Sequence, residues 1–214
     1  MKKQLLNTVL GAILIGIVSF GMLSFETPKT ILNISDTSTN ENATFYKNIT
    51  VNGVNIFYRE AGDVKKPTIL LLHGYPTSSH MFRNLITDLS VRYHVLAPDY
   101  PGFGRSDQPL MKDFDYTFDN MAHIVEGFLK ELKVEKYSIY LMDYGAPIGF
   151  RIAAKYPERV ESLIIQNGNA YDEGLKDFWI PIKKYWNDYT VENGKPLEGF
   201  HSPYTATALQ KLLD

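Results

Sequence analysis

An aspartate at the end of an apolar run is the first residue of this chain whose type and position could do chemistry. The segment SIYLMDYGAPIGF, residues 138–150, has the pattern of a strand that stops at Asp143 and continues as a helix from Gly145. A carboxylate at the start of a helix faces unpaired backbone N–H groups and the positive end of the helix dipole, which favour its charged form. Asp143 is therefore either a cap for the helix or a nucleophile that needs no base to activate it.

Two further loops place polar residues at the ends of apolar runs. One is His73-Gly74-Tyr75-Pro76, and the other is DYPGFGRSD at 99–107. In a parallel sheet the carboxyl ends of the strands meet at one edge, where working residues sit. We therefore expect these loops to lie beside Asp143, with Asp99 supporting the loops rather than reacting.

The elements that must position these loops follow from the spacing of the apolar residues. Alternation around Asn52-Gly53 predicts a β-hairpin, and short apolar runs alternate afterwards with segments of helical spacing. In chain order we expect a hairpin at 44–62, a strand at 67–74, a helix at 78–90, a strand at 93–100, a helix at 117–132, a strand at 137–143, a helix at 145–159 and a strand at 161–168. This order predicts an α/β fold with a mostly parallel sheet wrapped by helices.

The hairpin, the HGYP loop, the DYPGFGRSD loop and the sharp strand-to-helix turn occur in an order that resembles the α/β-hydrolase fold family, over roughly residues 44–175. The family's usual G-x-S-x-G turn reads Leu141-Met142-Asp143-Tyr144-Gly145 here. The chain is thus similar to the branch with an aspartate nucleophile, the epoxide hydrolases and haloalkane dehalogenases. The resemblance implies a hydrolase that forms an alkyl-enzyme ester on an epoxide or alkyl halide and then hydrolyses it.

The resemblance also implies roles for single residues. Asp143 would be the nucleophile, and the backbone N–H groups of Tyr75 and Tyr144 would form the oxyanion hole. The residues expected to shape the site without reacting are His73, Gly74, Pro76 and Gly145. The first small position of the turn is occupied by Leu141, so the packing between strand and helix must make room there.

The segment 171–214 is expected to begin a helical lid over the site. Large apolar residues of this segment have the spacing of one helical stripe, for which the alternative is an ordinary core stripe. They are Phe178, Trp179, Ile182, Tyr185, Trp186 and Tyr189. Lid tyrosines and tryptophans can donate hydrogen bonds to an epoxide oxygen or a departing halide. The candidates for contact with the substrate are Trp179, Tyr185, Trp186 and Tyr189.

The hydrolytic step needs a histidine base and an orienting acid, and neither has a clear place in this chain. In one dehalogenase subgroup the acid follows the strand after the nucleophile, a place taken here by Asn167. The chain ends at Asp214, within the expected lid, so we expect the late strands of the fold to lie outside it. Such a chain would turn over at most once and keep an adduct on Asp143. The alternative is a non-catalytic remnant or binding scaffold of the same fold.

The substrate preference rests on two positions. Haloalkane dehalogenases usually carry Asn or Glu after the His-Gly pair and Trp after the nucleophile, whereas this chain has Tyr75 and Tyr144. The HGYP loop is closer to the epoxide hydrolase form. We therefore expect epoxides to be opened faster than halide is released from haloalkanes.

Composition excludes several other classes. With 214 residues, of which 44% are hydrophobic, the chain can bury a core, and its net charge of −2 offers no basic face for nucleic acid. The absence of cysteine excludes disulfides and thiolate chemistry. We expect a small-molecule substrate, no metal and no cofactor, and the oligomeric state stays open. The remaining histidines are His80, His94, His123 and His201. No two of them have the spacing of metal ligands together with a third ligand. None of them follows a late strand, where the base of the family would lie.

The first 25 residues differ from the rest of the chain. Lys2 and Lys3 precede a run from Leu5 to Phe25 that contains no charged residue. This pattern predicts a signal peptide or an N-terminal membrane anchor, followed by a linker at 26–43. The folded part, a core at 44–170 and the lid, is then expected outside the cytoplasm, in the periplasm or extracellular space or facing outward from a membrane.

Overall fold

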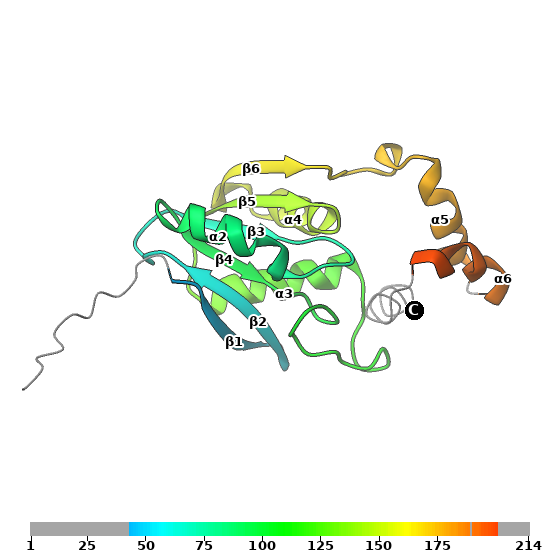
Figure 1. Cartoon of the computed structure of the whole chain (residues 1–214), viewed down its shortest axis with the longest axis horizontal. Helices are drawn as coiled ribbons and strands as arrows, with labels where there is room; N and C mark the ends of the chain where they lie inside the picture. The colour runs from blue at the N-terminus through cyan, green and yellow to red at the C-terminus, as the bar shows by residue number, and fades with distance from the viewer. Residues whose placement is uncertain (1–42, 189, 201–214) are drawn as a thin grey trace, which may run out of the picture. The chain divides into compact units, whose positions relative to one another are not determined.

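The strands form one six-stranded sheet in the order β1-β2-β4-β3-β5-β6 (Figure 1). The structure is a computed structural model that describes residues 43–188 and 190–200. The strands are β1 (Phe45–Val51), β2 (Val54–Ala61), β3 (Thr68–Leu72), β4 (His94–Pro98), β5 (Tyr137–Met142) and β6 (Val160–Gln166). The expected α/β architecture is confirmed.

The sheet is antiparallel at one side and parallel over the rest. β1 pairs with β2 and β2 with β4 in antiparallel register, while β4, β3, β5 and β6 are parallel to one another. The predicted hairpin turns at Asn52 and Gly53, whose φ angles are 50° and 83°. Positive φ at both central residues is what a tight hairpin with right-handed strand twist requires.

Helices cover both faces of the sheet. They are α2 (Arg83–Ser90), α3 (Phe118–Glu131) and α4 (Gly145–Lys155). Because side chains alternate along a strand, Leu70 and Leu72 of β3 pack in the core on the face with α3 and α4, whereas Ile69 and Leu71 pack in the core with α2. Figure 1 shows α2 on one side of the sheet and α3 on the other. Both faces of β3 are therefore buried, as its continuous apolar sequence predicts.

Adjacent parallel strands bring the site loops together. β3 pairs directly with β5, with Leu72 opposite Leu141. The loop that starts at His73 and the turn at Asp143 therefore leave the sheet at the same edge, next to each other.

The helix predicted at 145–159 is shorter than expected. α4 ends at Lys155, and a separate 3₁₀ turn, η2 (Pro157–Arg159), leads into β6. Proline lacks the backbone N–H that an α-helix needs, so Pro157 starts the new turn instead of extending the old one.

The segment after β6 consists of short helices. They are η3 (Asp172–Gly174), η4 (Asp177–Trp179), α5 (Ile180–Asn187), α6 (Val191–Gly194) and η5 (Lys195–Phe200). The predicted single stripe is wrong in one respect, because the chain changes from a 3₁₀ turn to an α-helix at Trp179, where Pro181 lies in the first turn of α5. Of the predicted stripe, Ile182 is buried and Phe178 is 55% exposed.

The predicted anchor, the linker up to residue 42 and the residues from 201 onward lie outside the described residues. Within residues 43–200, no helix combines the length and the apolar character needed to cross a bilayer. The described residues all fall in one compact unit, Ser38–Asp214.

Candidate active site

Asp143 occupies a strained turn between β5 and α4. Its φ angle is 47°, in the left-handed region that a non-glycine residue rarely adopts. The N-cap residue of α4 is Tyr144, and no side chain caps the helix. Asp143 is therefore not the N-cap residue of α4, which was the alternative that the sequence left open.

Two backbone N–H groups converge on one oxygen of Asp143. The N–H of Tyr75 donates to Oδ1 at 2.8 Å, and the N–H of Tyr144 donates to the same oxygen at 2.6 Å. These are the two groups that the resemblance implies for the oxyanion hole. Within the described part of the chain, Oδ2 has no hydrogen bond, so one carboxylate oxygen is held and the other is available.

Small residues permit this close approach. A Cβ on Gly74 would collide with the Asp143 side chain, and a Cβ on Gly145 would lie 2.9 Å from the Cβ of Leu72 and closer still to its carbonyl. A side chain at either glycine would therefore collide with its neighbours at this turn. The Tyr75–Pro76 peptide bond is cis.

The large side chain of Leu141 is accommodated by a small residue in α4, not by one in the turn at Asp143. Leu141 is fully buried, and the position it faces in α4 is Gly149, where an added Cβ would lie 2.8 Å from Leu141 Cδ2. The small residue that the family places in the turn is thus replaced by a small residue one element later.

His73 is a buried scaffold residue beneath the loop. Its Nδ1 lies 3.1 Å from the carbonyl oxygen of Gly74, and its Nε2 accepts from the N–H of Tyr100 at 3.4 Å. The Tyr100 hydroxyl donates to the His73 carbonyl at 3.0 Å, and the two rings stack at 4.2 Å. Burial lowers the pKa of His73 below its ordinary value, which favours a neutral ring that fixes the loop. Sequence reasoning missed Tyr100, because its contacts with His73 span 27 positions.

Asp99 organises the loop at 99–107, as expected. Its Oδ1 accepts from the N–H of Ser79 at 2.7 Å, and its Oδ2 accepts from the N–H of Arg105 at 2.9 Å. Both oxygens are engaged and the residue is 1% exposed. Asp99 is therefore a structural carboxylate.

A cavity of about 640 Å³ contains Asp143. Among the residues that line this elbow cavity are Phe118, Asp143, Tyr144, Asn167, Trp179 and Trp186. Two of the predicted lid residues, Trp179 and Trp186, thus share a cavity with the predicted nucleophile. Tyr185 is not among the residues that line this cavity and lies against Gly194. Tyr189 lies outside the described residues.

A comparison with family models addresses the fold. The model of the alpha/beta hydrolase fold matches residues 67–204. The chain belongs to the α/β-hydrolase fold family. This family membership covers the sheet from β3 onward, the turn at Asp143 and the helices after β6.

Relatives of this hydrolase-fold chain lie in the expected branch. An uncharacterised hydrolase of Saccharomyces cerevisiae is 49% identical over 148 residues, which cover 69% of this chain and 50% of the relative. A haloalkane dehalogenase of Mycolicibacterium paratuberculosis is 40% identical over 112 residues, covering 52% of this chain and 37% of the relative. The solved structure of epoxide hydrolase A from Mycobacterium thermoresistibile aligns with a TM-score of 0.53 and 30% identity, over 57% of this chain and 39% of that one. The chain spans about half the length of the yeast relative and less of the others.

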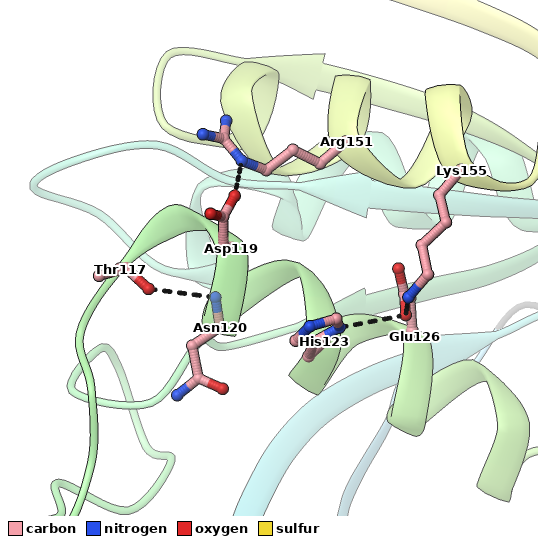
Figure 2. Close-up of polar contacts among 7 residues, drawn as sticks. All are labelled: Thr117, Asp119, Asn120, His123, Glu126, Arg151 and Lys155. Carbon is pink, nitrogen blue, oxygen red and sulfur yellow. Dashed lines mark hydrogen bonds and ion pairs between the residues drawn. The ribbon is translucent and has the colours of Figure 1, made fainter.

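The turn at Asp143 leads into α4, and ion pairs hold α4 against α3 (Figure 2). Arg151 of α4 pairs with Asp119 of α3, and Lys155 donates to Glu126 at 2.7 Å. The Thr117 side chain accepts from the N–H of Asn120 at 3.3 Å and caps α3. Sequence reasoning did not select Phe118 or Arg151, although both line the elbow cavity, because their patterns are those of an ordinary helix.

The other histidines lie away from the elbow cavity. His123 is exposed on α3, and its Nδ1 lies 3.4 Å from Oε2 of Glu126 (Figure 2). The Nε2 atom of His94 lies 2.8 Å from Oε1 of Glu60. His80 lines a different cavity. His201 lies outside the described residues. Across the described ranges, no three His, Asp or Glu side chains are placed to hold a metal ion.

Proposed function

We propose that this chain carries the nucleophile of an α/β-fold hydrolase in which Asp143 forms an alkyl-enzyme ester with its substrate. The observation that supports this most is the pair of N–H groups on Oδ1. They orient the carboxylate and leave Oδ2 without a hydrogen bond within the described residues, at the wall of a cavity. An ionised carboxylate of this kind can attack an electrophilic sp³ carbon without a base.

In the first step, Oδ2 of Asp143 forms a bond to the substrate carbon, and the bond to the leaving atom breaks with its electron pair. For an alkyl halide the leaving atom departs as halide, and for an epoxide it stays attached as an alkoxide. Because Asp143 is fixed by the two amides and by the turn, the reacting oxygen is oriented before the substrate arrives.

In the second step, water attacks Cγ of the ester and negative charge develops on Oδ1. The N–H groups of Tyr75 and Tyr144 already donate to this oxygen. Donors placed beforehand stabilise the developing charge without reorganisation. A general base must activate the water, and of the described histidines none lines the elbow cavity.

The proposed substrates are epoxides or alkyl halides. Relatives named haloalkane dehalogenase and a structural neighbour named epoxide hydrolase support this range. We favour epoxides, because the positions next to the nucleophile and after His73-Gly74 are the tyrosines Tyr144 and Tyr75.

Intact mass spectrometry of the 214-residue chain tests this function. After incubation with a reactive epoxide or haloalkane, the wild type is expected to gain the mass of one substrate-derived group, located on Asp143 by peptide mapping. Asp143→Asn should gain none, and the matched control Asp88→Asn, at an exposed position of α2, should react like the wild type. An unmodified wild type, or an adduct that persists in Asp143→Asn, would contradict the proposal and would favour a non-catalytic scaffold.

A further inference from the structure

A buried positive charge lies next to the segment that follows the HGYP loop. Arg59 of β2 is 8% exposed, and its hydrogen bonds within the described residues go to Ser79 Oγ at 3.1 Å and His80 Nδ1 at 3.3 Å. None of the ion pairs among the described residues includes Arg59. The carboxylate of Asp99 uses its two oxygens for the backbone N–H groups of Ser79 and Arg105. Burying a charge without an opposite charge is costly, so this charge points to an anion that binds here.

His80 links the buried charge to a cavity. A guanidinium can only donate hydrogen bonds, so Nδ1 of His80 accepts from Arg59 and the ring proton lies on Nε2. His80 lines a cavity of about 450 Å³, the loop cavity, and no hydrogen bond to its Nε2 is present among the described residues. The Nε2 proton is thus held in place through Arg59 and is available to a ligand.

The described wall of the loop cavity has donors but no carboxylate. Ser78, His80 and Arg83 line it, together with residues of the HGYP loop and of the loop at 99–107. Nη1 of Arg83 donates to the carbonyl oxygen of His80 at 3.4 Å, so the guanidinium lies beside that residue. No Asp or Glu is among the described residues that line the loop cavity, and it shares no lining residue with the elbow cavity. Its chemistry therefore suits an anion and is separate from that of the candidate nucleophile.

Two guanidinium groups stack on aromatic rings of the hairpin. Arg59 Cζ lies 4.9 Å from the ring centroid of Tyr46 and 5.8 Å from that of Phe57. Arg105 Cζ lies 4.7 Å from the centroid of Phe57, and Arg105 directly follows Gly104, which lines the loop cavity. Stacking fixes the plane of a guanidinium and leaves the N–H groups in that plane available for an oxyanion. Two positive charges at one ring also repel each other, and a nearby anion would offset this repulsion.

We propose that the loop cavity binds a phosphate group, which accepts hydrogen bonds from Nε2 of His80 and from Arg83. The charges of Arg59 and Arg105 favour the anion at longer range, and the Ser78 hydroxyl is a further donor. A phosphate suits this set better than a carboxylate, because it offers acceptor oxygens in more directions and pairs well with guanidinium groups. The ligand is thus a phosphate monoester, either a soluble molecule or a lipid headgroup. This site is independent of the proposed hydrolase reaction.

Binding of inorganic phosphate to the 214-residue chain tests the site. The dissociation constant is measured by isothermal titration calorimetry at constant ionic strength, with chloride as the balancing anion. Arg83→Gln should raise it by about 10-fold or more, the usual cost of losing a hydrogen bond to a charged group. The matched control Arg92→Gln removes the same charge at an exposed position after α2 and should keep the wild-type constant. A wild type that binds no phosphate, or equal weakening in both variants, would overturn the proposal.

Two further measurements separate ligand binding from a folding defect. His80→Asn keeps an acceptor near the position of Nδ1 and removes Nε2, so it should weaken phosphate binding without lowering the midpoint of thermal unfolding in phosphate-free buffer. Amide NMR signals of the wild type locate the ligand without any substitution, and those of Ser78, His80 and Gly104 should shift when phosphate is added. Wild-type affinity in His80→Asn, or signal shifts confined to other parts of the chain, would contradict the proposed site.

Vesicles distinguish the two sources of the phosphate group. If the ligand is a lipid headgroup, more of the chain should sediment with vesicles that contain phosphatidic acid than with phosphatidylcholine alone, and Arg83→Gln should remove this difference. If the ligand is soluble, inorganic phosphate should bind in the manner that depends on Arg83, and phosphatidic acid should not increase sedimentation. Either result supports the site. Failure of Arg83→Gln to weaken both inorganic phosphate binding and vesicle binding would overturn it.

Discussion

At the scale of single residues, the site depends on how closely backbone and carboxylate approach. The Asp143 side chain lies where a Cβ on Gly74 would be, and this contact places Oδ1 at 2.8 Å from the N–H of Tyr75. The approach has a steric origin, because Gly74 is not in the left-handed region, unlike Gly53 with a φ of 83°. A methyl group at position 74 therefore has one predictable effect, which is to push the carboxylate away from its donor.

We expect Gly74→Ala to slow adduct formation on Asp143 by about 10²-fold, the cost typical of a displacement near 1 Å in an oriented site. The initial rate with styrene oxide, followed by intact mass, measures this. Gly53→Ala is the control, since no heavy atom lies within 4 Å of the added carbon and only the φ of 83° is strained. It should lower stability and leave the rate unchanged. Equal rates for Gly74→Ala and the wild type would show that the close contact does not position the nucleophile.

At the scale of elements, the packing of α4 on β5 depends on where a small residue lies. The first small position of the family's turn is taken by Leu141, and the small residue that faces it is Gly149 in α4. Leu141 and Leu72 are fully buried, and they fill the space that a side chain at Gly149 would take, with their methyl carbons 2.8 Å and 3.2 Å from an added Cβ. The strand can therefore keep a large residue beside the turn because the helix that packs on it has none at that point.

Gly149→Ala should destabilise the protein, although alanine is the better helix former. The gain in helix propensity is about 1 kcal/mol, whereas overpacking a buried site costs about 1–3 kcal/mol. In a Leu141→Val background, which removes the Cδ2 that the new methyl meets, the same change should become stabilising. Urea denaturation of the four proteins gives the coupling free energy between the two positions. Additive effects would mean that Leu141 is not what Gly149 accommodates.

At the scale of the whole molecule, a polar cluster around the buried Glu60 joins the antiparallel hairpin to the parallel part of the sheet. Glu60 on β2 accepts from Lys47 on β1 at 2.6 Å and pairs with His94 on β4 at 2.8 Å. The bond to His94 lowers the pKa of Glu60, burial opposes this, and the bond to Lys47 lowers it further. The net direction is below the ordinary value of 4.5.

Acid should therefore weaken the fold through Glu60. Because its folded pKa lies below its unfolded pKa, its contribution is complete above about pH 4.5 and is lost as the pH falls through the lower folded value. We expect Glu60→Gln to flatten the fall of the unfolding free energy below this pH, by at most about 1.4 kcal/mol per pH unit. Urea denaturation between about pH 6 and about pH 3 measures the slopes. Glu161→Gln, at an exposed position of β6, is the control and should keep the wild-type slope. An unchanged slope in Glu60→Gln would show that the cluster does not couple folding to pH.

The sequence by itself determined the order of strands and helices and the position of the candidate nucleophile. Apolar periodicity is local, so β3, β5 and α3 could be predicted from neighbouring residues, and the loops at their carboxyl ends followed from parallel pairing. Helix ends depended on finer local chemistry, and Pro157 ended the helix after β5 earlier than its apolar pattern indicated.

Only the tertiary structure decided how these parts meet. The contact of Tyr75 with Asp143 spans 68 positions, and that of Tyr100 with His73 spans 27. Nothing in the sequence next to Leu141 shows that Gly149 makes room for it, and nothing next to Trp186 shows that its Nε1 is buried without a partner among the described residues. Hydrogen bonding and packing in a core depend on which distant atoms arrive at the same place, and a pattern along the chain carries no distances between them.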